Sequence, residues 1–332
     1  MSRGLLLTFI TILFAASAFA YKPESGHEPL TNVATEIYQR CFTGSHLARV
    51  SGWRARLVEG NRAMDEGLGF DLVDWLRLND DGVFSLWRRS VNWHFYHPER
   101  THHSRALLVE QSLERLWQDL KQGLEKHRKP YHKLMFAGGL MHFIEDMTVP
   151  AHVVPVYHGP TLIEVVGPFQ LKPLVDYMQA FRPEFKGMII DAVDKQPVQS
   201  SRIKSQLLED TGFCQQISHH NPKIDTILRQ TARQTLHALQ QAIPDCPQHR
   251  WQDFWQPPEG EAFFGRYAVY HQDGVTKNPL FGEAGALENA EGRLCLFEKE
   301  DVRYKDFLFA RQRDAVEADL RVLNWVERQL SR

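Results

Sequence analysis

The sequence of 332 residues predicts an all-α protein. Apolar residues recur with the 3.6-residue period of a helix in several segments, whereas strand-like alternation is rare. No internal repeat and no low-complexity tract divides the chain. We therefore expect a leader over residues 1–20, followed by one multi-helix domain over residues 21–332.

The predicted helices follow one another along most of the chain, and each has an apolar face. They cover residues 31–41, 105–127, 133–147, 223–243 and 301–330. The best strand candidate, residues 265–272, alternates only weakly. The part from residue 223 to the end either completes the helical core or forms a small added module.

Residues 244–290 interrupt the helical pattern as an irregular insertion rich in proline, glycine and aromatic residues. A loop of this length in a compact domain is usually functional or a small subdomain. Its aromatic side chains either pack back onto the helices or form a flap that contacts lipid or substrate. They are Trp251, Phe254, Trp255, Phe263, Phe264, Tyr267 and Tyr270.

Charge and composition exclude two classes of protein. The 39 basic and 41 acidic residues nearly cancel, which argues against a polyanion binder held by bulk electrostatics. An apolar content of 43% excludes a wholly disordered chain. The unusual component is histidine, with 16 residues, many of them between His94 and His158.

The first 20 residues have the form of a secretory signal peptide. Arg3 precedes an apolar run, and Ala18 and Ala20 form a small-residue cleavage site. The alternative is a membrane anchor, but the run is short for a span of about 20 residues. Cleavage after Ala20 would make Tyr21 the mature N-terminus and place the protein in the periplasm or outside the cell.

Export would put the four cysteines, Cys41, Cys214, Cys246 and Cys295, in an oxidising compartment. Four cysteines allow two disulfides in three connectivities. We favour Cys214–Cys246, because this bridge would join the two ends of one helical segment. The cysteines lack the close spacing of a structural zinc site.

The most informative segment for chemistry runs from residue 138 to residue 152. His142 and Asp146 are four residues apart on a predicted helix, so they share a face and can hold one ion. Pro150 ends the helix and lets the chain present His152. Imidazole and carboxylate ligands suit Zn²⁺. The glycines at 138–139 would let another backbone approach one turn earlier.

Further candidate ligands lie on both sides of this segment. His27 follows closely behind Tyr21, whose free amino group could itself bind zinc. The other candidate ligands are Asp80, Asp81, His94, His158 and Glu164. Taken singly, each candidate also has an ordinary structural interpretation, as a packed histidine or a turn.

The order of these residues resembles the zinc-dependent phospholipase C superfamily, which also contains the single-strand-specific zinc nucleases. The most specific match is His142-x3-Asp146-x5-His152. The stretch 94–98, His-Phe-Tyr-His-Pro, is similar to the family's His-Phe-Tyr-Asp-Pro. The resemblance covers residues 21–164, which is less than half of the chain.

This resemblance implies an all-α domain whose cleft holds three zinc ions. The first ion would be held by His94, His142, Asp146 and either Asp80 or Asp81. The second would be held by Asp146, His27 and the amino and carbonyl groups of Tyr21. The third would be held by His152, His158 and Glu164.

Besides His97, which stands where the family has aspartate, two further features depart from the family pattern. Tyr21 stands where the family usually has tryptophan, and six positions separate Glu164 from His158 instead of four. The chain must therefore break at residues 159–160, Gly-Pro, for Glu164 to reach the ion. Glu145 lies off the predicted metal face, where it would cap, pair or support a ligand.

Clustered zinc suits the hydrolysis of phosphodiester bonds. The resemblance gives Asp80 or Asp81 the task of orienting or deprotonating the attacking water. We expect a phospholipase C for glycerophospholipids such as phosphatidylcholine, in transient contact with a membrane surface and without an obligate protein partner. The alternatives are a single-strand nuclease, which would bind nucleic acid, and a non-catalytic exported zinc- or lipid-binding module.

Overall fold

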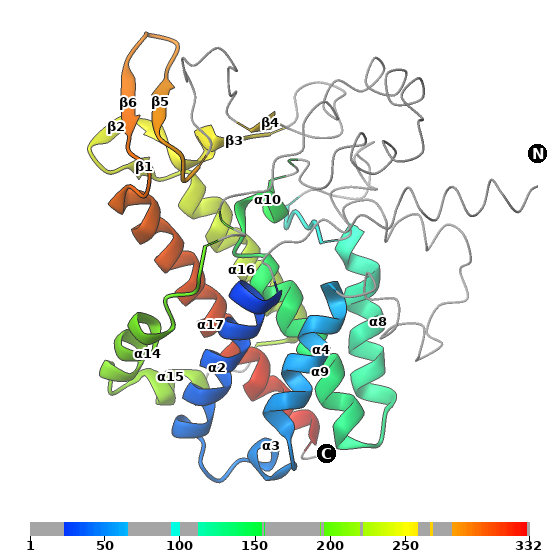
Figure 1. Ribbon diagram of the computed structural model, residues 1–332. Coiled ribbons are helices and arrows are strands. Elements are labelled where there is room, and N and C mark those ends of the chain that lie inside the picture. Colours follow the sequence, from blue (N-terminus) through cyan, green and yellow to red (C-terminus); the bar gives the residue numbers. More distant parts are fainter. Residues whose placement is uncertain are drawn as a thin grey trace, which may run out of the picture.

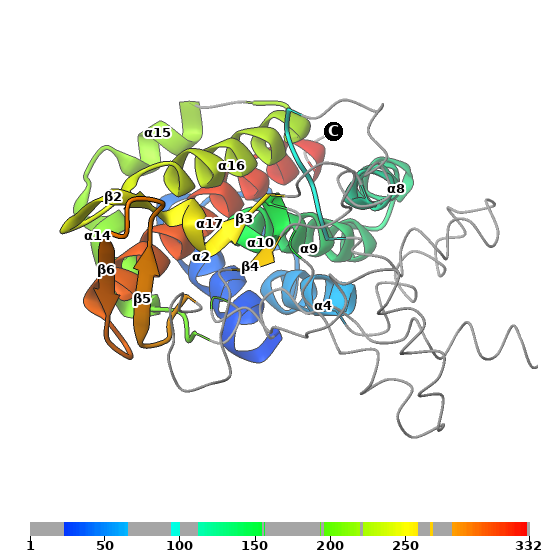
Figure 2. The same ribbon diagram turned by 90° about the horizontal axis from the view of Figure 1, so that it is seen from above.

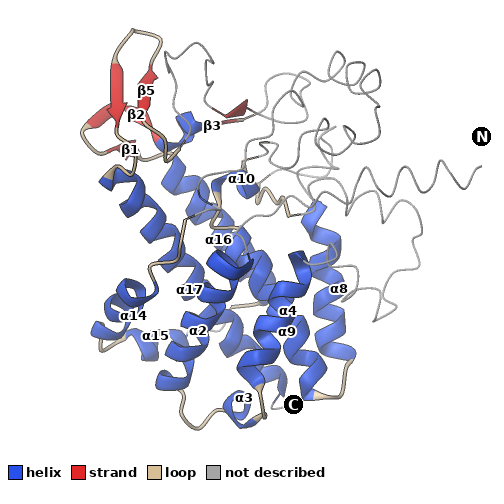
Figure 3. Ribbon diagram, in the orientation of Figure 1, coloured by secondary structure: helices blue, strands red, loops and turns tan. Residues whose placement is uncertain are grey.

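The computed structural model describes residues 23–65, 94–99, 112–154, 156, 193, 196–219, 222–257, 266–267 and 281–330. These residues are mostly helical, with a few short strands (Figure 3). The predicted mostly helical class is therefore confirmed. The leader over residues 1–20 lies outside the described residues.

The helical part is built from one π-helical turn and a series of α-helices (Figure 1). They are η1 (Pro23–His27), α2 (Glu28–Cys41), α3 (His46–Arg49), α4 (Trp53–Asp65), α8 (Ser112–Lys126), α9 (Pro130–Asp146), α10 (Pro150–Val153), α14 (Ser200–Glu209), α15 (Phe213–His219), α16 (Ile224–Leu239) and α17 (Val302–Leu330).

Helix α9 lies at the centre of this bundle. It packs against α4, α8 and α17, and Figure 2 shows these helices gathered around it. Every residue from Phe136 to Asp146 is buried. A helix that is buried on all sides belongs to the core of a protein, so the residues at its C-terminal end are fixed by several neighbours. Helix α17 also packs on α2 and α16, and it therefore completes the helical core.

Two glycines allow α4 and α9 to approach backbone to backbone. A β-carbon on Gly138 would overlap the carbonyl oxygen of Leu57, and one on Gly60 would overlap that of Met135. The expectation that Gly138 admits another backbone is confirmed. Its neighbour Gly139 instead faces side chains, those of Leu120 and Met64.

Each predicted helix overlaps an observed one, with shifted ends. The first begins earlier, at Glu28, because Pro29 occupies its first turn, where a missing N–H costs nothing. The fourth ends earlier than expected, at Leu239, and the chain turns into a strand before Pro244. Helices α3, α4, α14 and α15 were not predicted, since they are short or have no clear apolar stripe.

The strands within the described residues form three antiparallel two-stranded pairs at one end of the helical bundle (Figures 1 and 3). The pairs are β1 (Ala242–Ile243) with β2 (Cys246–Arg250), β3 (Trp255–Gln256) with β4 (Arg266–Tyr267), and β5 (Gly285–Glu288) with β6 (Leu294–Phe297). The expectation of an irregular insertion was thus incomplete. Of the predicted strand over 265–272, the described part is β4.

Aromatic side chains of this region pack back onto α17. Trp251, in the short 3₁₀ turn η5 (Trp251–Phe254), lies 4.6 Å from Phe307 between ring centroids. Phe281 lies 4.6 Å from Tyr304 by the same measure. Trp251, Phe254, Trp255 and Tyr267 are all buried, and the packing interpretation is confirmed for the first three, whose rings contact Tyr304 or Phe307 of α17. Phe263, Phe264 and Tyr270 lie outside the described residues.

Two disulfides join the cysteines as Cys41–Cys214 and Cys246–Cys295. The preference for Cys214–Cys246 was wrong. The 16 residues of α16 lie between those positions as a rigid rod about 24 Å long, far beyond the reach of one bridge. Two disulfides are consistent with an oxidising, extracellular or periplasmic environment.

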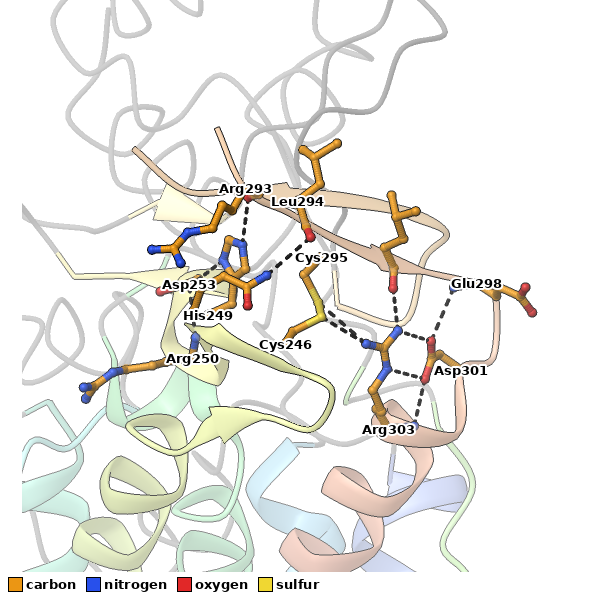
Figure 4. The surroundings of a disulfide bond; sticks show 12 residues. Cys246, His249, Arg250, Asp253, Arg293, Leu294, Cys295, Glu298, Asp301 and Arg303 are labelled. Carbon is orange, nitrogen blue, oxygen red and sulfur yellow. Dashed lines mark hydrogen bonds and ion pairs between the residues drawn. A yellow bond between two sulfur atoms is a disulfide. The ribbon is translucent and has the colours of Figure 1, made fainter. Parts of the chain in front are cut away.

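The second disulfide is embedded in a polar network (Figure 4). The Arg303 guanidinium lies 3.4 Å from the sulfur of Cys246 and 3.6 Å from that of Cys295, and it also pairs with Asp301. These contacts tie the β5–β6 hairpin to the first turn of α17. No helix in the described part of the chain is both long and apolar enough to cross a membrane.

Candidate metal centre

Four segments that are distant in sequence bring imidazole and carboxylate groups together in the core. His27 comes from η1, His94 from the stretch 94–99, His142 and Asp146 from the end of α9, and His152 from α10. All five side chains are completely buried. Burial of this many ionisable groups is costly unless they are paired or hold a metal ion.

The end of α9 sets the positions of three of these residues. Asp146 is its last residue, and the hydroxyl of Thr148 donates a hydrogen bond to the Glu145 carbonyl oxygen at 2.7 Å. After this turn, Pro150 starts α10 and returns His152 to the centre. The backbone N–H of Tyr96 donates to the carbonyl oxygen of His152 at 3.0 Å, which fixes the stretch 94–99 beside α10.

Asp146 is the common member of the centre. Its Oδ2 lies 2.6 Å from Nδ1 of His94 and 3.5 Å from Nε2 of His142, and these two nitrogens are 3.3 Å apart. Its Oδ1 lies 3.4 Å from Nε2 of His27. Oδ2 of Asp146 thus faces His94 and His142, whereas Oδ1 faces His27.

Two sets of potential ligand atoms lie close enough to share an ion. One contains His27, His142 and Asp146, and the other contains His94, Asp146 and His152. Within each set the ligand atoms are within 4.8 Å of one another. Asp146 belongs to both sets and could therefore bridge two ions.

Backbone and side-chain acceptors hold Nδ1 of two of the histidines, His152 and His27. Nδ1 of His152 donates to the carbonyl oxygen of His94 at 3.2 Å, so its lone pair is on Nε2. Nδ1 of His27 contacts the Glu145 carboxylate at 2.5 Å and donates to it. Metal-bound histidines usually have their other ring nitrogen held in this way.

Asn61 of α4 orients the third imidazole. Its Nδ2 donates to Thr31 at 2.8 Å and to Glu145 at 3.0 Å, which leaves its Oδ1 as an acceptor. That oxygen lies 3.3 Å from Nδ1 of His142, whose Nε2 therefore keeps the lone pair that faces Asp146. The close approach of α4 and α9 is what brings Asn61 to this position.

The protonation states match the requirements of a zinc site. Burial, reinforced by the neighbouring His27, lowers the pKa of His142 well below its usual range, so the ring is neutral near pH 7. Burial opposes ionisation of Asp146, but His142 and His94 hold its pKa well below the usual range. Neutral imidazoles around a carboxylate are typical ligands of Zn²⁺.

One buried carboxylate oxygen of Asp146 indicates whether the centre has room for a cation. Oδ1 of Asp146 accepts no hydrogen bond within the part of the chain that the structure describes, although it is buried and faces an imidazole. A buried acceptor of this kind needs an explanation, and a bound cation is one. The donor set and this oxygen therefore fit a bound metal ion.

The Glu145 carboxylate supports the centre by hydrogen bonds and is not itself one of the candidate ligands. Besides His27 and Asn61 it accepts a hydrogen bond from the hydroxyl of Thr31 at 2.8 Å. The sequence placed Glu145 off the metal face, and the structure places it there, against a ligand. Thr31 and Asn61 were not foreseen, since single polar residues within helices carry no recognisable pattern.

The remaining predicted ligands lie outside the described residues. These are Tyr21, Asp80, Asp81, His158 and Glu164. The structure therefore describes five of the ten candidates and brings those five together.

A separate cavity of about 390 Å³ lies between α14, α15 and α17. Its arginines, Arg313 and Arg321, both pair with Glu317, and Asp210 also lines the cavity, so two basic residues face two acidic ones. Because these charges cancel locally, the cavity offers no excess positive charge to a phosphate group.

Comparison with known proteins adds nothing to this geometry. No family model matches the chain, and no curated protein and no solved structure shows significant similarity to it. The chemistry of the centre therefore rests on its own residues.

Proposed function

We propose that this protein is an exported, zinc-dependent hydrolase of phosphodiester bonds that acts on glycerophospholipids as a phospholipase C. One observation carries the proposal. The five described candidates, selected from sequence order, come together from four segments around a shared, buried carboxylate. Their resemblance to the zinc-dependent phospholipase C superfamily supplies the reaction type.

The residues of the chain have separable tasks in this proposal. His27, His94, His142, Asp146 and His152 would hold zinc, and Asp146 would contact two ions. Bound zinc supplies Lewis-acid polarisation of a phosphoryl oxygen and lowers the pKa of a coordinated water. Asp80 or Asp81 would accept a proton from the attacking water, as the resemblance implies.

The chain also prepares the ligands before an ion arrives. Glu145, Asn61 and the His94 carbonyl oxygen each hold one imidazole in the tautomer that leaves Nε2 available. Asp146 remains ionised at neutral pH, and burial keeps water from competing for these groups. Such preorganisation lowers the reorganisation needed on binding.

The balanced charge of the chain favours phospholipid over nucleic acid. With 39 basic and 41 acidic residues, no bulk field would gather a polyanion, whereas a zwitterionic headgroup requires none. The nuclease remains the alternative within the same superfamily, and a non-catalytic zinc- or lipid-binding module is the alternative outside catalysis. All three can be separated by one set of assays.

The test uses purified mature protein with phosphatidylcholine vesicles and with single-stranded DNA. Each substrate is assayed with zinc, with a chelator, and with zinc restored after chelation. We expect phosphocholine release that the chelator abolishes and zinc restores, while the DNA stays intact. Asp146→Ala should abolish activity, and the control Asp306→Ala, at a residue whose side chain is 58% exposed, should not.

Other outcomes are equally clear. Cleavage of DNA without phosphocholine release would replace the phospholipase by the nuclease. Stoichiometric zinc without either activity would indicate the binding module. Absence of zinc in the purified protein and after reconstitution would overturn every metal-dependent interpretation.

A further inference from the structure

Thr235 of α16 is a buried polar residue that the proposed metal centre does not include. Its hydroxyl oxygen lies 2.7 Å from the carbonyl oxygen of Met147, which is in the turn between α9 and α10. The carbonyl oxygen of Thr231, one turn earlier on α16, is 3.3 Å away. A hydroxyl group has one proton to donate, and the shorter distance identifies Met147 as its acceptor.

The choice of acceptor distinguishes Thr235 from Thr231, which is on the same helix. Threonine hydroxyls inside helices commonly donate to the carbonyl oxygen four residues earlier. Thr231 does so, to Ile227 at 2.9 Å. Both threonine side chains are buried, so the difference between them is not one of exposure. Thr235 instead connects α16 to the end of α9.

The carbonyl group of Met147 is one that needs a partner from outside its helix. Met147 directly follows the last residue of α9, and the last carbonyl groups of an α-helix have no acceptor role within that helix. Met147, Thr148 and Val149 are all completely buried. A buried carbonyl group that loses its donor is destabilised, so the hydroxyl of Thr235 fixes this turn from the side of α16.

The turn determines the position of one of the two ligand sets. His152 follows it, with its backbone N–H donating to the carbonyl oxygen of Val149 at 3.0 Å. The ring of His152 donates to the carbonyl oxygen of His94, and Tyr96 donates its N–H to the carbonyl oxygen of His152. A displacement of the turn would therefore move His152 and His94 together.

The other ligand set is oriented from a different direction. Nδ1 of His27 is held by the carboxylate of Glu145, and Nδ1 of His142 lies 3.3 Å from the amide oxygen of Asn61. Glu145 belongs to α9 and Asn61 to α4, and neither contact involves the turn after α9.

We propose that Thr235 is a positioning residue for the ligand set of His94, Asp146 and His152. Its hydrogen bond to Met147 sets where α10 begins relative to the end of α9. The inference deepens the proposed function and rests on it for the metal ion. It predicts that loss of the hydroxyl weakens one zinc position and spares the other.

The decisive substitution is Thr235→Val, which keeps the shape of the side chain but cannot donate. Zinc affinity of the set that contains His152 should fall about tenfold, while that of the set that contains His27 should stay within about threefold of the wild type. Thr235→Ser keeps the hydroxyl and should restore the affinity of the wild type. Thr231→Val is the matched control, because the hydroxyl it removes bonds only within α16 among the contacts of the described chain.

The two ligand sets are measured separately in one zinc titration. Free zinc is buffered with a chelator, and binding is followed by the ring ¹⁵N resonances of His27 and His152, one from each set. A second readout needs no metal. Amide hydrogen exchange of Tyr96 should be faster in metal-free Thr235→Val than in the wild type, and unchanged in Thr235→Ser and Thr231→Val.

Three results would overturn the inference. The first is an unchanged affinity of the His152 set in Thr235→Val. The second is an equal loss at both sets, or an equal loss in Thr231→Val, since either is the pattern of general destabilisation. The third is a loss in Thr235→Ser as large as in Thr235→Val, which would exclude the hydroxyl as the cause.

Two further outcomes are covered by the same design. If Thr235→Val does not fold, Thr235→Ala takes its place, because it removes the hydroxyl without placing a methyl group against the carbonyl oxygen of Met147. If the wild type binds no zinc, the proposed function fails. The exchange of the Tyr96 amide then still tests whether Thr235 holds α10, and unchanged exchange in Thr235→Val would refute it.

Discussion

Gly138 of α9 lies against the backbone of Leu57 in α4, with no room between them for a β-carbon. The next turn of α4 carries Asn61, whose amide bonds both Glu145 and His142. A β-carbon on Gly138 would also lie 2.7 Å from the backbone nitrogen of Asn61. The closeness of two helices therefore determines the orientation of two imidazoles in the metal centre, one directly and one through Glu145.

Replacing Gly138 by alanine should force these helices apart. Alanine favours a helix by up to about 1 kcal/mol over glycine, but overpacking against rigid backbone costs typically about 1–3 kcal/mol and can cost more. We expect a net loss in the free energy of unfolding and weaker zinc binding, measured by urea denaturation and chelator competition. Gly44→Ala is the control, because a β-carbon there meets nothing within 4 Å. Unchanged stability of Gly138→Ala would contradict the close backbone packing of α9 against α4 at this position.

Replacing Glu145 by glutamine should weaken zinc binding more than it weakens the fold. The amide can still accept from His27 and Asn61, but it lacks the negative charge that makes His27 a better ligand. We expect zinc affinity to fall about tenfold, at the lower end of the range for such supporting residues.

The control for this variant is Glu36→Gln, at a surface carboxylate that pairs with Lys204 and Arg54. Its zinc affinity should equal that of the wild type. Equal affinities for all three proteins in a competition titration would show that Glu145 does not support a metal ligand.

The metal-free protein should lose stability as the pH falls below about 6.5, the ordinary pKa of histidine. Burial lowers the pKa of His142 in the folded state, so the unfolded chain binds more protons between the two pKa values. The free energy of unfolding therefore rises with pH in this window, by at most about 1.4 kcal/mol per pH unit for one group.

Urea denaturation in the presence of a chelator, from pH 7.5 down to pH 5, measures this dependence. His142→Asn removes the titrating group, so its stability should change less with pH than that of the wild type. Parallel curves for the two proteins would mean that His142 is not the group responsible.

The sequence was sufficient for the parts of the centre that obey local periodicity. His142 and Asp146 lie one turn apart on a predicted helix, which ends at Asp146, and Pro150 starts the short helix that carries His152. Relations of this kind depend on helix geometry alone. The predicted helices were located for the same reason, with errors at their ends, where capping and neighbouring turns decide.

Tertiary packing determined what the sequence did not show. Asn61 is a single polar residue on a helix, and only the contact of α4 with α9 gives it a role. The disulfide pairing also depends on which elements lie next to each other. Cys41 bonds to Cys214 of α15, and Cys246 bonds to Cys295 of β6. Spacing along the chain contains no information about either contact.

The two disulfides should differ in their effect on the metal centre. Replacing Cys246 and Cys295 by serine opens a loop of 49 residues, which in the chain-entropy description costs about 4 kcal/mol of stability. Because that bridge joins two hairpins and the described ligands lie on other elements, zinc stoichiometry should be unchanged. Urea midpoints and zinc content of the folded variant measure the two effects.

Replacing Cys41 and Cys214 provides the comparison, since that bridge spans 173 residues and its loss should cost about 5 kcal/mol. In the hairpin variant, Arg303 still pairs with Asp301 and packs over Phe297, so the hairpin keeps a second attachment to α17. A hairpin variant that folds and yet loses its zinc would show that the strand region contributes to the centre. Retained zinc with lowered stability would show that the helical core alone holds the described ligands.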